Sequence, residues 1–271
     1  MNYNLLQVPR HQSELRCAVA AKGRPAHLDS GHDAIARVLE SCDVVVDPRD
    51  GSVAKHMLEV GFWEWWVTKS MADCMRPGTV CVDLGANAGY FGALFHSLGA
   101  SAVISVEANP DLARRLRLTG ERNGWQNFEV LECAVGDREG TAKLLVHAED
   151  NLGGSCIVPE GTKHPGRQIE VPIRTLDQLL LDLAPIQVLK MDCEGSEPAI
   201  WRGMQGVLQR NPDMHIFAEV TVNHEAAPWL RQVEAQGYTL RYCEGDCTMP
   251  PLVIDRLGER DLWMAYFHKE Q

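Results

Sequence analysis

The chain has 271 residues, of which 45% are hydrophobic and 23% charged, and its formal net charge is −11. This length suits one α/β domain of about 200 residues with an added segment. The negative charge disfavours a nucleic-acid partner, which needs a positive protein face. No apolar run reaches the ~18 residues of a membrane span, and the N-terminus does not have the pattern of a signal peptide. We therefore expect a cytoplasmic protein without a membrane partner.

The N-terminal part differs in pattern from the rest of the chain. We expect residues 1–75 to form an extension that packs on a main domain of residues 76–271. It contains a predicted strand at 43–47 and a tryptophan-rich helix at 56–73, which ends before the breaker Arg76-Pro77-Gly78. The aromatic cluster in this helix is interpreted as core, with an acceptor pocket as the alternative; its members are Phe62, Trp63, Trp65 and Trp66.

From residue 79 onward, short apolar runs alternate with helical stretches. This alternation predicts a doubly wound α/β fold with a mostly parallel sheet and helices on both faces. The expected strands are 79–84, 102–106, 128–131, 187–191, 214–220 and 263–268, with smaller pieces at 141–146 and 169–173. The expected helices are 90–98, 110–123, 197–208 and 228–236.

A polar stretch at 148–167 interrupts the alternation. A loop of that length is usually functional or mobile. Its paired glycines, Gly153 and Gly154, suggest a hinge. We expect the segment to close over a ligand, with a plain surface loop as the alternative.

The sharpest local signal is VCVDLGANAGYFG at 80–92. An apolar strand ends at Asp83, and a turn with Gly85, Asn87 and Gly89 leads into a helix. Glycine allows a tight turn and a close approach of a ligand to the backbone. The next strand ends at Glu107, and an acidic residue there can accept hydrogen bonds from ribose hydroxyls.

Two ligand classes fit this turn: a nicotinamide dinucleotide and S-adenosylmethionine. The glycines do not have the G-x-G-x-x-G spacing that places a pyrophosphate on a helix N-terminus. Asp83 would also repel a pyrophosphate, whereas a carboxylate suits the ammonium group of an amino-acid ligand. The motif therefore favours S-adenosylmethionine.

Four stretches together resemble the FkbM-type S-adenosylmethionine-dependent methyltransferases. They are VDLGANAGYFG (82–92), VISVEANPDLARRL (103–116), ECAVGDREGTAKL (132–144) with a later RTLDQLL (174–180), and VLKMDCEGSEPAIWRGM (188–204). The resemblance covers about residues 60–220 and implies a Rossmann-like methyltransferase sheet. It also implies methyl transfer, usually to a hydroxyl of a sugar, polyketide or related natural product. It extends the donor contacts to Ala108, to Cys133 and Ala134 at the adenine, and to Glu64 at the amino-acid part.

The segment DCEGSE follows the strand at 187–191, and we expect it to face the same cleft as Asp83 and Glu107. Transfer to a hydroxyl needs positioning and a base. Asp192 is the first candidate for positioning the acceptor or acting as base, Glu194 the second, and His224 a further candidate base. Glu197 has two equally supported interpretations: a residue of the site, or a carboxylate whose charge is stabilised by the dipole of the following helix.

A metal is possible at this edge but is not favoured. Asp192 and Glu219 end neighbouring predicted strands, and catechol-type O-methyltransferases use a divalent cation such as Mg²⁺ at a comparable place. Cys243 and Cys247 have the spacing of two zinc ligands, yet a matching second pair is missing nearby.

The sequence thus predicts an S-adenosylmethionine-dependent O-methyltransferase that acts on a hydroxylated small molecule. A nicotinamide-dependent oxidoreductase and a non-catalytic Rossmann-like binding module are the alternatives. The oligomeric state is left open.

Overall fold

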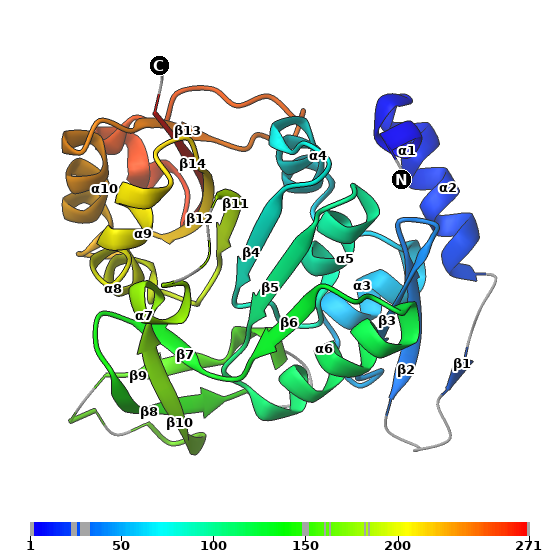
Figure 1. Cartoon of the computed structure of the whole chain (residues 1–271), viewed down its shortest axis with the longest axis horizontal. Helices are drawn as coiled ribbons and strands as arrows, with labels where there is room; N and C mark the ends of the chain where they lie inside the picture. Colours follow the sequence, from blue (N-terminus) through cyan, green and yellow to red (C-terminus); the bar gives the residue numbers. More distant parts are fainter. Residues whose placement is uncertain are drawn as a thin grey trace.

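The computed structural model of the chain describes residues 3–22, 26–27, 33–147, 152–159, 161–162, 164–181, 183 and 185–269. Its centre is a seven-stranded sheet with the order β13-β14-β12-β11-β4-β5-β6 (Figure 1). The strands are β4 (Val80–Leu84), β5 (Ala102–Val106), β6 (Phe128–Leu131), β11 (Ile186–Met191), β12 (His215–Thr221), β13 (Thr239–Tyr242) and β14 (Leu262–His268). Only β14 runs antiparallel to its neighbours in this sheet. The predicted doubly wound, mostly parallel sheet is confirmed, and its strand order reverses between β4 and β11.

Helices cover both faces of the central sheet. On the right in Figure 1 lie α5 (Tyr90–Ser97) and α6 (Pro110–Asn123), with α4 (Trp65–Cys74) above them. On the left lie α8 (Glu197–Arg202), α9 (Gln205–Arg210) and α10 (Ala226–Ala235). Two further elements are α7 (Leu176–Leu179) and the 3-10 helix η2 (Ile254–Glu259). None of the described helices is long and apolar enough to cross a membrane.

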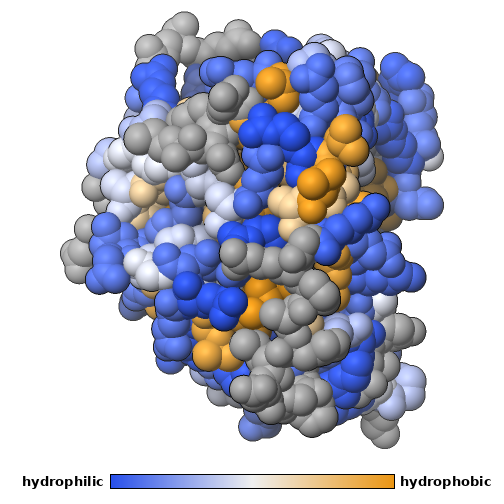
Figure 2. Space-filling view, turned by 90° about the vertical axis from the view of Figure 1, so that its right-hand side faces the viewer, coloured by the Kyte–Doolittle hydropathy of each residue, from blue (hydrophilic) through white to orange (hydrophobic). Residues whose placement is uncertain are grey.

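The N-terminal residues form a small layer beside α5 and α6. It consists of α1 (Tyr3–Gln7), α2 (Arg10–Lys22), α3 (Val53–Val60) and an antiparallel sheet of β1 (Ala26–His27), β2 (Ala34–Val38) and β3 (Cys42–Val46). Buried Arg115 connects α6 to this layer by two ion pairs, of 2.8 Å to Asp33 and of 2.9 Å to Asp47. The right-hand face of the molecule is largely hydrophilic, with small separate hydrophobic patches (Figure 2). The division at residue 75 stays a prediction, because the N-terminal layer and α5 contribute to one hydrophobic core.

Two helices that were predicted as continuous are broken. The stretch at 56–73 contains the end of α3 and most of α4, separated where Gly61 and Glu64 adopt positive φ angles of 74° and 37°. The stretch at 197–208 divides into α8 and α9 at Gly203. A β-carbon at Gly203 would lie 2.0 Å from the carbonyl oxygen of Gly136, so the close approach of these two backbones requires glycine there.

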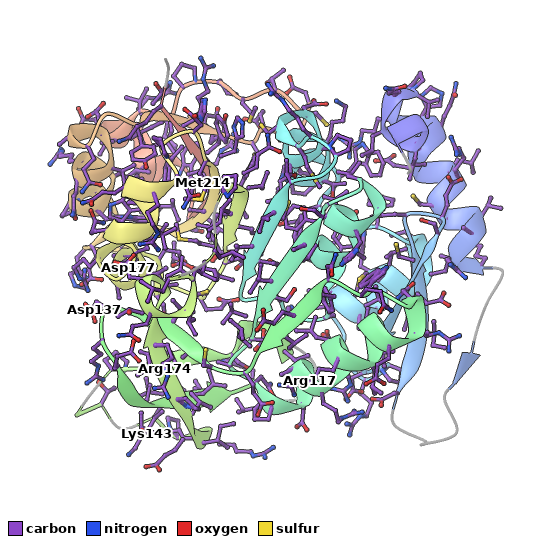
Figure 3. All side chains as sticks on the ribbon, viewed as in Figure 1. Arg117, Asp137, Lys143, Arg174, Asp177 and Met214 are labelled. Atoms are coloured by element: carbon purple, nitrogen blue, oxygen red, sulfur yellow. The ribbon has the colours of Figure 1, made fainter. Side chains whose placement is uncertain are left out.

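A second, four-stranded sheet with the order β7-β10-β8-β9 lies below the central sheet in Figure 1. Its strands are β7 (Ala134–Gly136), β8 (Gly140–Val146), β9 (Cys156–Val158) and β10 (Arg167–Thr175). The expectation of a structureless loop at 148–167 was wrong for β9 and for the 3-10 turn η1 (Leu152–Gly154), while residues 148–151, 160 and 163 lie outside the described chain. Asp137 pairs with Arg202 of α8 at 2.9 Å, and Asp177 accepts hydrogen bonds from the first turn of α9 (Figure 3).

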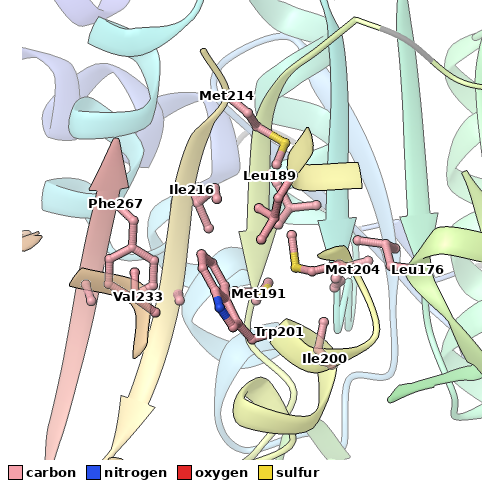
Figure 4. Packing of buried hydrophobic residues seen from close by; sticks show 14 of the residues in the cluster. Leu176, Leu189, Met191, Ile200, Trp201, Met204, Met214, Ile216, Val233 and Phe267 are labelled. Carbon is pink, nitrogen blue, oxygen red and sulfur yellow. The ribbon is translucent and has the colours of Figure 1, made fainter. Parts of the chain in front are cut away.

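The alternation of side chains along each strand supplies two cores. Val82 and Leu84 of β4 face the core under α8, α9 and α10, whereas Cys81 faces the core under α4 and α5. Figure 4 shows the first core, where Trp201 lies among side chains from the sheet and the helices. Helices bury both faces of the central sheet, so the sheet is open at the edge where its strands end.

Candidate functional site

A cavity of about 250 Å³ lies beyond the carboxyl ends of β4, β5 and β11, where the strand order reverses. Its walls come from the loops that follow these strands, from the second sheet and from the turn before α4. Open α/β sheets bind ligands at such a position. The cavity is therefore the candidate ligand site.

The glycine turn after β4 forms the floor of the cavity. Gly85 has a φ angle of 69°, and a β-carbon there would lie 1.8 Å from the backbone oxygen of Asp192. The backbone N–H groups of Gly85 and Ala86 both donate to the Val106 carbonyl, at 3.0 and 3.1 Å. These contacts bring the ends of β4, β5 and β11 together, and only glycine fits at position 85.

Glu107 follows β5 and is the best-anchored carboxylate in the cavity wall. Its Oε2 accepts a hydrogen bond of 2.8 Å from the Asn87 N–H, and its Oε1 accepts one of 2.8 Å from the Asn109 N–H. The side chain is only 7% exposed, and burial raises its pKa to about 7 against the opposing effect of the two N–H donors. Each oxygen retains lone pairs for hydroxyl donors in the cavity.

A buried charge cluster lies beneath the cavity. Lys190 of β11 is 2% exposed and pairs with Asp83 opposite it on β4. Its Nζ lies 2.9 Å from Asp192 Oδ2, 3.8 Å from Asp83 Oδ1 and 4.8 Å from the centre of the Phe91 ring. Burial raises the pKa of Asp83 to about 6, and Lys190 counteracts this rise. The carboxylate of Asp192 reaches the cavity wall, whereas that of Asp83 lies fully buried below it.

Further carboxyl groups line the cavity, and they outnumber its positively charged lining residue, Lys190. Burial, followed by the charge of Asp192, raises the pKa of Glu64 to about 7 and that of Glu219 to about 9. Burial also raises the pKa of Glu194. Lys190 is the cation that opposes all three shifts. A ligand with positive charge would relieve this repulsion.

The remaining wall is apolar and comes from both sheets. Ala108 and Leu112 line it after β5, Cys133 and Ala134 line it at the start of the second sheet, and β8 and β9 add Leu144 and Ile157. Sequence reasoning gave no role to Leu144 or Ile157, because nothing local shows that the second sheet folds back to the strand ends. An apolar slot beside a buried carboxylate suits a flat base next to a ribose.

Most of the predicted site residues meet at this cavity. Those in its wall are Glu64, Gly85, Asn87, Glu107, Ala108, Cys133, Ala134, Asp192, Glu194 and Glu219. Asp83 and Gly89 lie outside the wall: Asp83 is the buried partner of Lys190, and Gly89 begins α5 against Leu116. His224 is exposed beyond β12 and outside the wall, so the geometry gives no support to its prediction as a base.

Glu197 lies buried in the first turn of α8 and accepts a 2.6 Å hydrogen bond from the Cys193 N–H. Burial raises its pKa to about 7, so its interpretation as a helix-terminus charge stays a prediction. No group of three or more His, Cys, Asp or Glu side chains arranged to hold a metal occurs among the described residues. Asp192 and Glu219 therefore have no third candidate ligand within that part of the chain. Cys243 and Cys247 are both free thiols.

The strand order and the cavity at its reversal define a Rossmann-like protein with a candidate ligand site at the strand ends. A family model described as the methyltransferase FkbM domain matches residues 83–240. This match covers more than half of the chain, and the chain therefore belongs to the FkbM methyltransferase family. No curated protein matches the sequence.

Solved structures with a similar fold are distant in sequence. Methyltransferase FkbM from Methylobacillus flagellatus KT has 16% identity and a TM-score of 0.49, over 72% of this chain and 44% of that one. The chain thus spans less than half of that protein's length. Precorrin-6y C5,15-methyltransferase from Geobacter metallireducens GS-15 has 14% identity and a TM-score of 0.43, over 75% and 86% of the two chains. A Streptococcus mutans protein in complex with SAH has 10% identity and a TM-score of 0.44, over 75% and 96%.

Proposed function

We propose that the chain is an S-adenosylmethionine-dependent methyltransferase that methylates a hydroxyl oxygen of a small molecule, such as a sugar or polyketide intermediate. The observation that carries this proposal is Glu107, a buried carboxylate fixed by two backbone N–H groups beside an apolar slot. Such a carboxylate accepts hydrogen bonds from both hydroxyls of a ribose. The apolar slot then takes the adenine, in contact with Cys133 and Ala134.

The charge of the cavity distinguishes this donor from a nicotinamide dinucleotide. A pyrophosphate in the turn after β4 would meet a wall that contains Asp192, Glu64 and Glu219. S-adenosylmethionine has an ammonium and a sulfonium group, which these carboxylates attract. Asp192, held by Lys190, and Glu64 are the residues proposed to bind the amino-acid part.

S-adenosylmethionine supplies a methyl group: the acceptor oxygen bonds to the methyl carbon as the carbon–sulfur bond breaks, the electron pair of that bond stays on sulfur, and the hydroxyl proton leaves. The chain must then hold the acceptor oxygen in line and remove this proton. Apart from Glu107, which is assigned to the ribose, the carboxyl groups in the wall that can accept a proton are Asp192, Glu194, Glu64 and Glu219. Asp192 is paired with Lys190 at 2.9 Å, and Glu64 is assigned to the amino-acid part of the donor, so Glu194 and Glu219 are freer to act as base.

Isothermal titration with S-adenosylhomocysteine, NAD and NADP tests the donor assignment. We expect micromolar binding of S-adenosylhomocysteine and none of the dinucleotides. Dinucleotide binding without S-adenosylhomocysteine binding would reinstate the oxidoreductase alternative. Absence of binding by all three at millimolar concentration would reject the proposed donor site and favour a non-catalytic module.

A further inference from the structure

A second cavity of about 240 Å³ adjoins the first. The two share Glu64, Glu219 and Leu262 in their walls. The second cavity is otherwise built from α4 and from the C-terminal strands β13 and β14 with their connection. A molecule in it would therefore touch a ligand of the first cavity at the boundary formed by the two glutamates.

Aromatic side chains make up much of this second wall. Tyr242 of β13 and Trp263 of β14 meet edge to face with ring centres 4.7 Å apart, because antiparallel pairing makes them diagonal neighbours. Trp66 of α4 completes the aromatic lining and is half-buried. Aromatic rings offer flat apolar faces that pack against the carbon skeleton of a ring-shaped ligand.

The charged groups of the second cavity are mostly acidic. Arg260 lies over the rings of Tyr242 and Trp263, at 5.1 and 4.7 Å from their centres, and its guanidinium pairs with Glu244. This pair neutralises the arginine, so Glu64 and Glu219 determine the remaining charge of the wall. Carboxyl groups form hydrogen bonds with hydroxyls in either protonation state, and once ionised they repel anions.

We infer that the second cavity is the acceptor subsite and that it takes a hydroxyl-bearing ring without negative charge. The inference rests on the proposed methyl transfer, since it needs a donor in the first cavity. The ring packs on Trp66 and Tyr242, and the hydroxyl to be methylated lies at the boundary beside Glu219 and Glu64. A phosphorylated or carboxylated acceptor is disfavoured, because the cation in the described lining of this cavity, Arg260, is already paired with Glu244, and a buried anion without a partner is costly.

The test uses the full chain saturated with S-adenosylhomocysteine and two probes that differ at C6, where one has a neutral hydroxymethyl group and the other a carboxylate. They are methyl β-D-glucopyranoside and the corresponding methyl glucuronide, with binding followed by saturation-transfer NMR. We expect the neutral glycoside to bind at millimolar concentration and the glucuronide to bind at least ~10-fold more weakly, a difference of about 1.4 kcal/mol. Glu244→Gln releases Arg260 and should strengthen glucuronide binding.

Variants of the aromatic lining test whether the neutral glycoside binds in the second cavity. Trp66→Leu and Tyr242→Leu should weaken the neutral glycoside at least ~5-fold, as for the loss of an aromatic contact, and leave the affinity for S-adenosylhomocysteine within about twofold. Trp125→Leu is the control, because Trp125 is also half-buried but stacks on His96 and lines neither cavity.

The inference is overturned if neither glycoside binds, if the glucuronide binds as tightly as the neutral probe, or if the Trp66 and Tyr242 variants behave like the Trp125 control. In those outcomes S-adenosylhomocysteine still binds and the proposed donor site stands. Loss of S-adenosylhomocysteine binding in the unmodified chain would instead reject the proposed function itself.

Discussion

Replacement of Glu107 by glutamine is the most direct test of the donor site. The glutamate oxygens accept two backbone N–H groups, each at 2.8 Å, and are proposed to accept two ribose hydroxyls. In Glu107→Gln one oxygen becomes an NH₂ group that faces an N–H donor, and the negative charge is lost. A hydrogen bond to a charged group contributes about 1.5–3 kcal/mol. The dissociation constant of S-adenosylhomocysteine should therefore rise about 10- to 150-fold.

The assay is a cycle of two protein forms and two ligands. Isothermal titration compares S-adenosylhomocysteine with its 2′-deoxy analogue on the wild-type chain and on Glu107→Gln. If Glu107 binds the ribose, removal of the hydroxyl weakens binding to the wild type much more than to the variant. The coupling free energy should be at least about 1 kcal/mol.

Stability must be measured alongside, because one backbone N–H loses its acceptor in Glu107→Gln. An unpaired buried N–H costs about 1–3 kcal/mol, so the melting temperature should fall while the chain stays folded. Additive effects in the cycle, with a coupling near zero in a folded variant, would refute the assignment of Glu107 to the ribose. They would also remove the main support for the donor.

Three further predictions concern the cavity and its surroundings. Lys190→Met leaves the fully buried Asp83 without its cation and should lower the free energy of unfolding by about 3–5 kcal/mol in urea denaturation. Gly153→Ala places a β-carbon 2.4 Å from Asn87 Nδ2, so Asn87 must move and S-adenosylhomocysteine should bind about tenfold more weakly in titration calorimetry. Because burial raises the pKa of Glu64 to about 7, and a cationic donor favours its ionised form, binding of S-adenosylmethionine should strengthen as the pH rises toward 7 and level off above it, with a slope of at most about tenfold per pH unit for each proton released.

Each of these predictions has a control. Lys69→Met breaks an exposed ion pair with Asp73 and should cost at most about 1 kcal/mol; an equal cost for Lys190→Met would contradict the buried pairing. Gly258→Ala introduces a β-carbon with no neighbour within 4 Å, and donor affinity should be unchanged. Glu64→Gln should flatten the pH dependence of donor binding, and a profile that is already flat in the wild type would exclude Glu64 from the donor site.

The part of the first cavity formed by the glycine turn and Glu107 could be predicted from sequence because its signals are local. Gly85 and Glu107 each follow an apolar strand directly, and parallel strands bring their carboxyl ends to one edge. The glycine at 85 is dictated by backbone contact with Asp192, which is distant in sequence, yet the turn pattern alone revealed it. Asp83 shows the limit of this reasoning: the pattern placed a carboxylate near the turn and could not tell that its side chain pairs with Lys190 below the cavity wall.

The lining of the second cavity could not be found in this way. Tyr242 and Trp263 become neighbours only through the antiparallel pairing of β13 with β14, and β13 was not predicted at all. Trp66 belonged to the aromatic cluster interpreted as core, and it does pack partly against a core. Tertiary contacts of this kind leave no spacing pattern in the sequence. The two broken helices had a weak local signal, since glycine stands at each break, but helical periodicity outweighed it.

The net charge of −11 disfavoured a nucleic-acid partner but could not show which charged residues act at the cavities. In the folded chain, Lys190 lies between Asp83 and Asp192, and these two carboxylates account for its charge. Glu64 and Glu219 then stand at the boundary of both cavities, where burial and, after it, the charge of Asp192 raise their pKa values more than Lys190 lowers them. A cationic donor would supply the missing positive charge and lower those pKa values, so that a carboxylate able to accept a proton forms beside the acceptor. The same residues would thereby make donor binding and proton removal parts of one electrostatic arrangement.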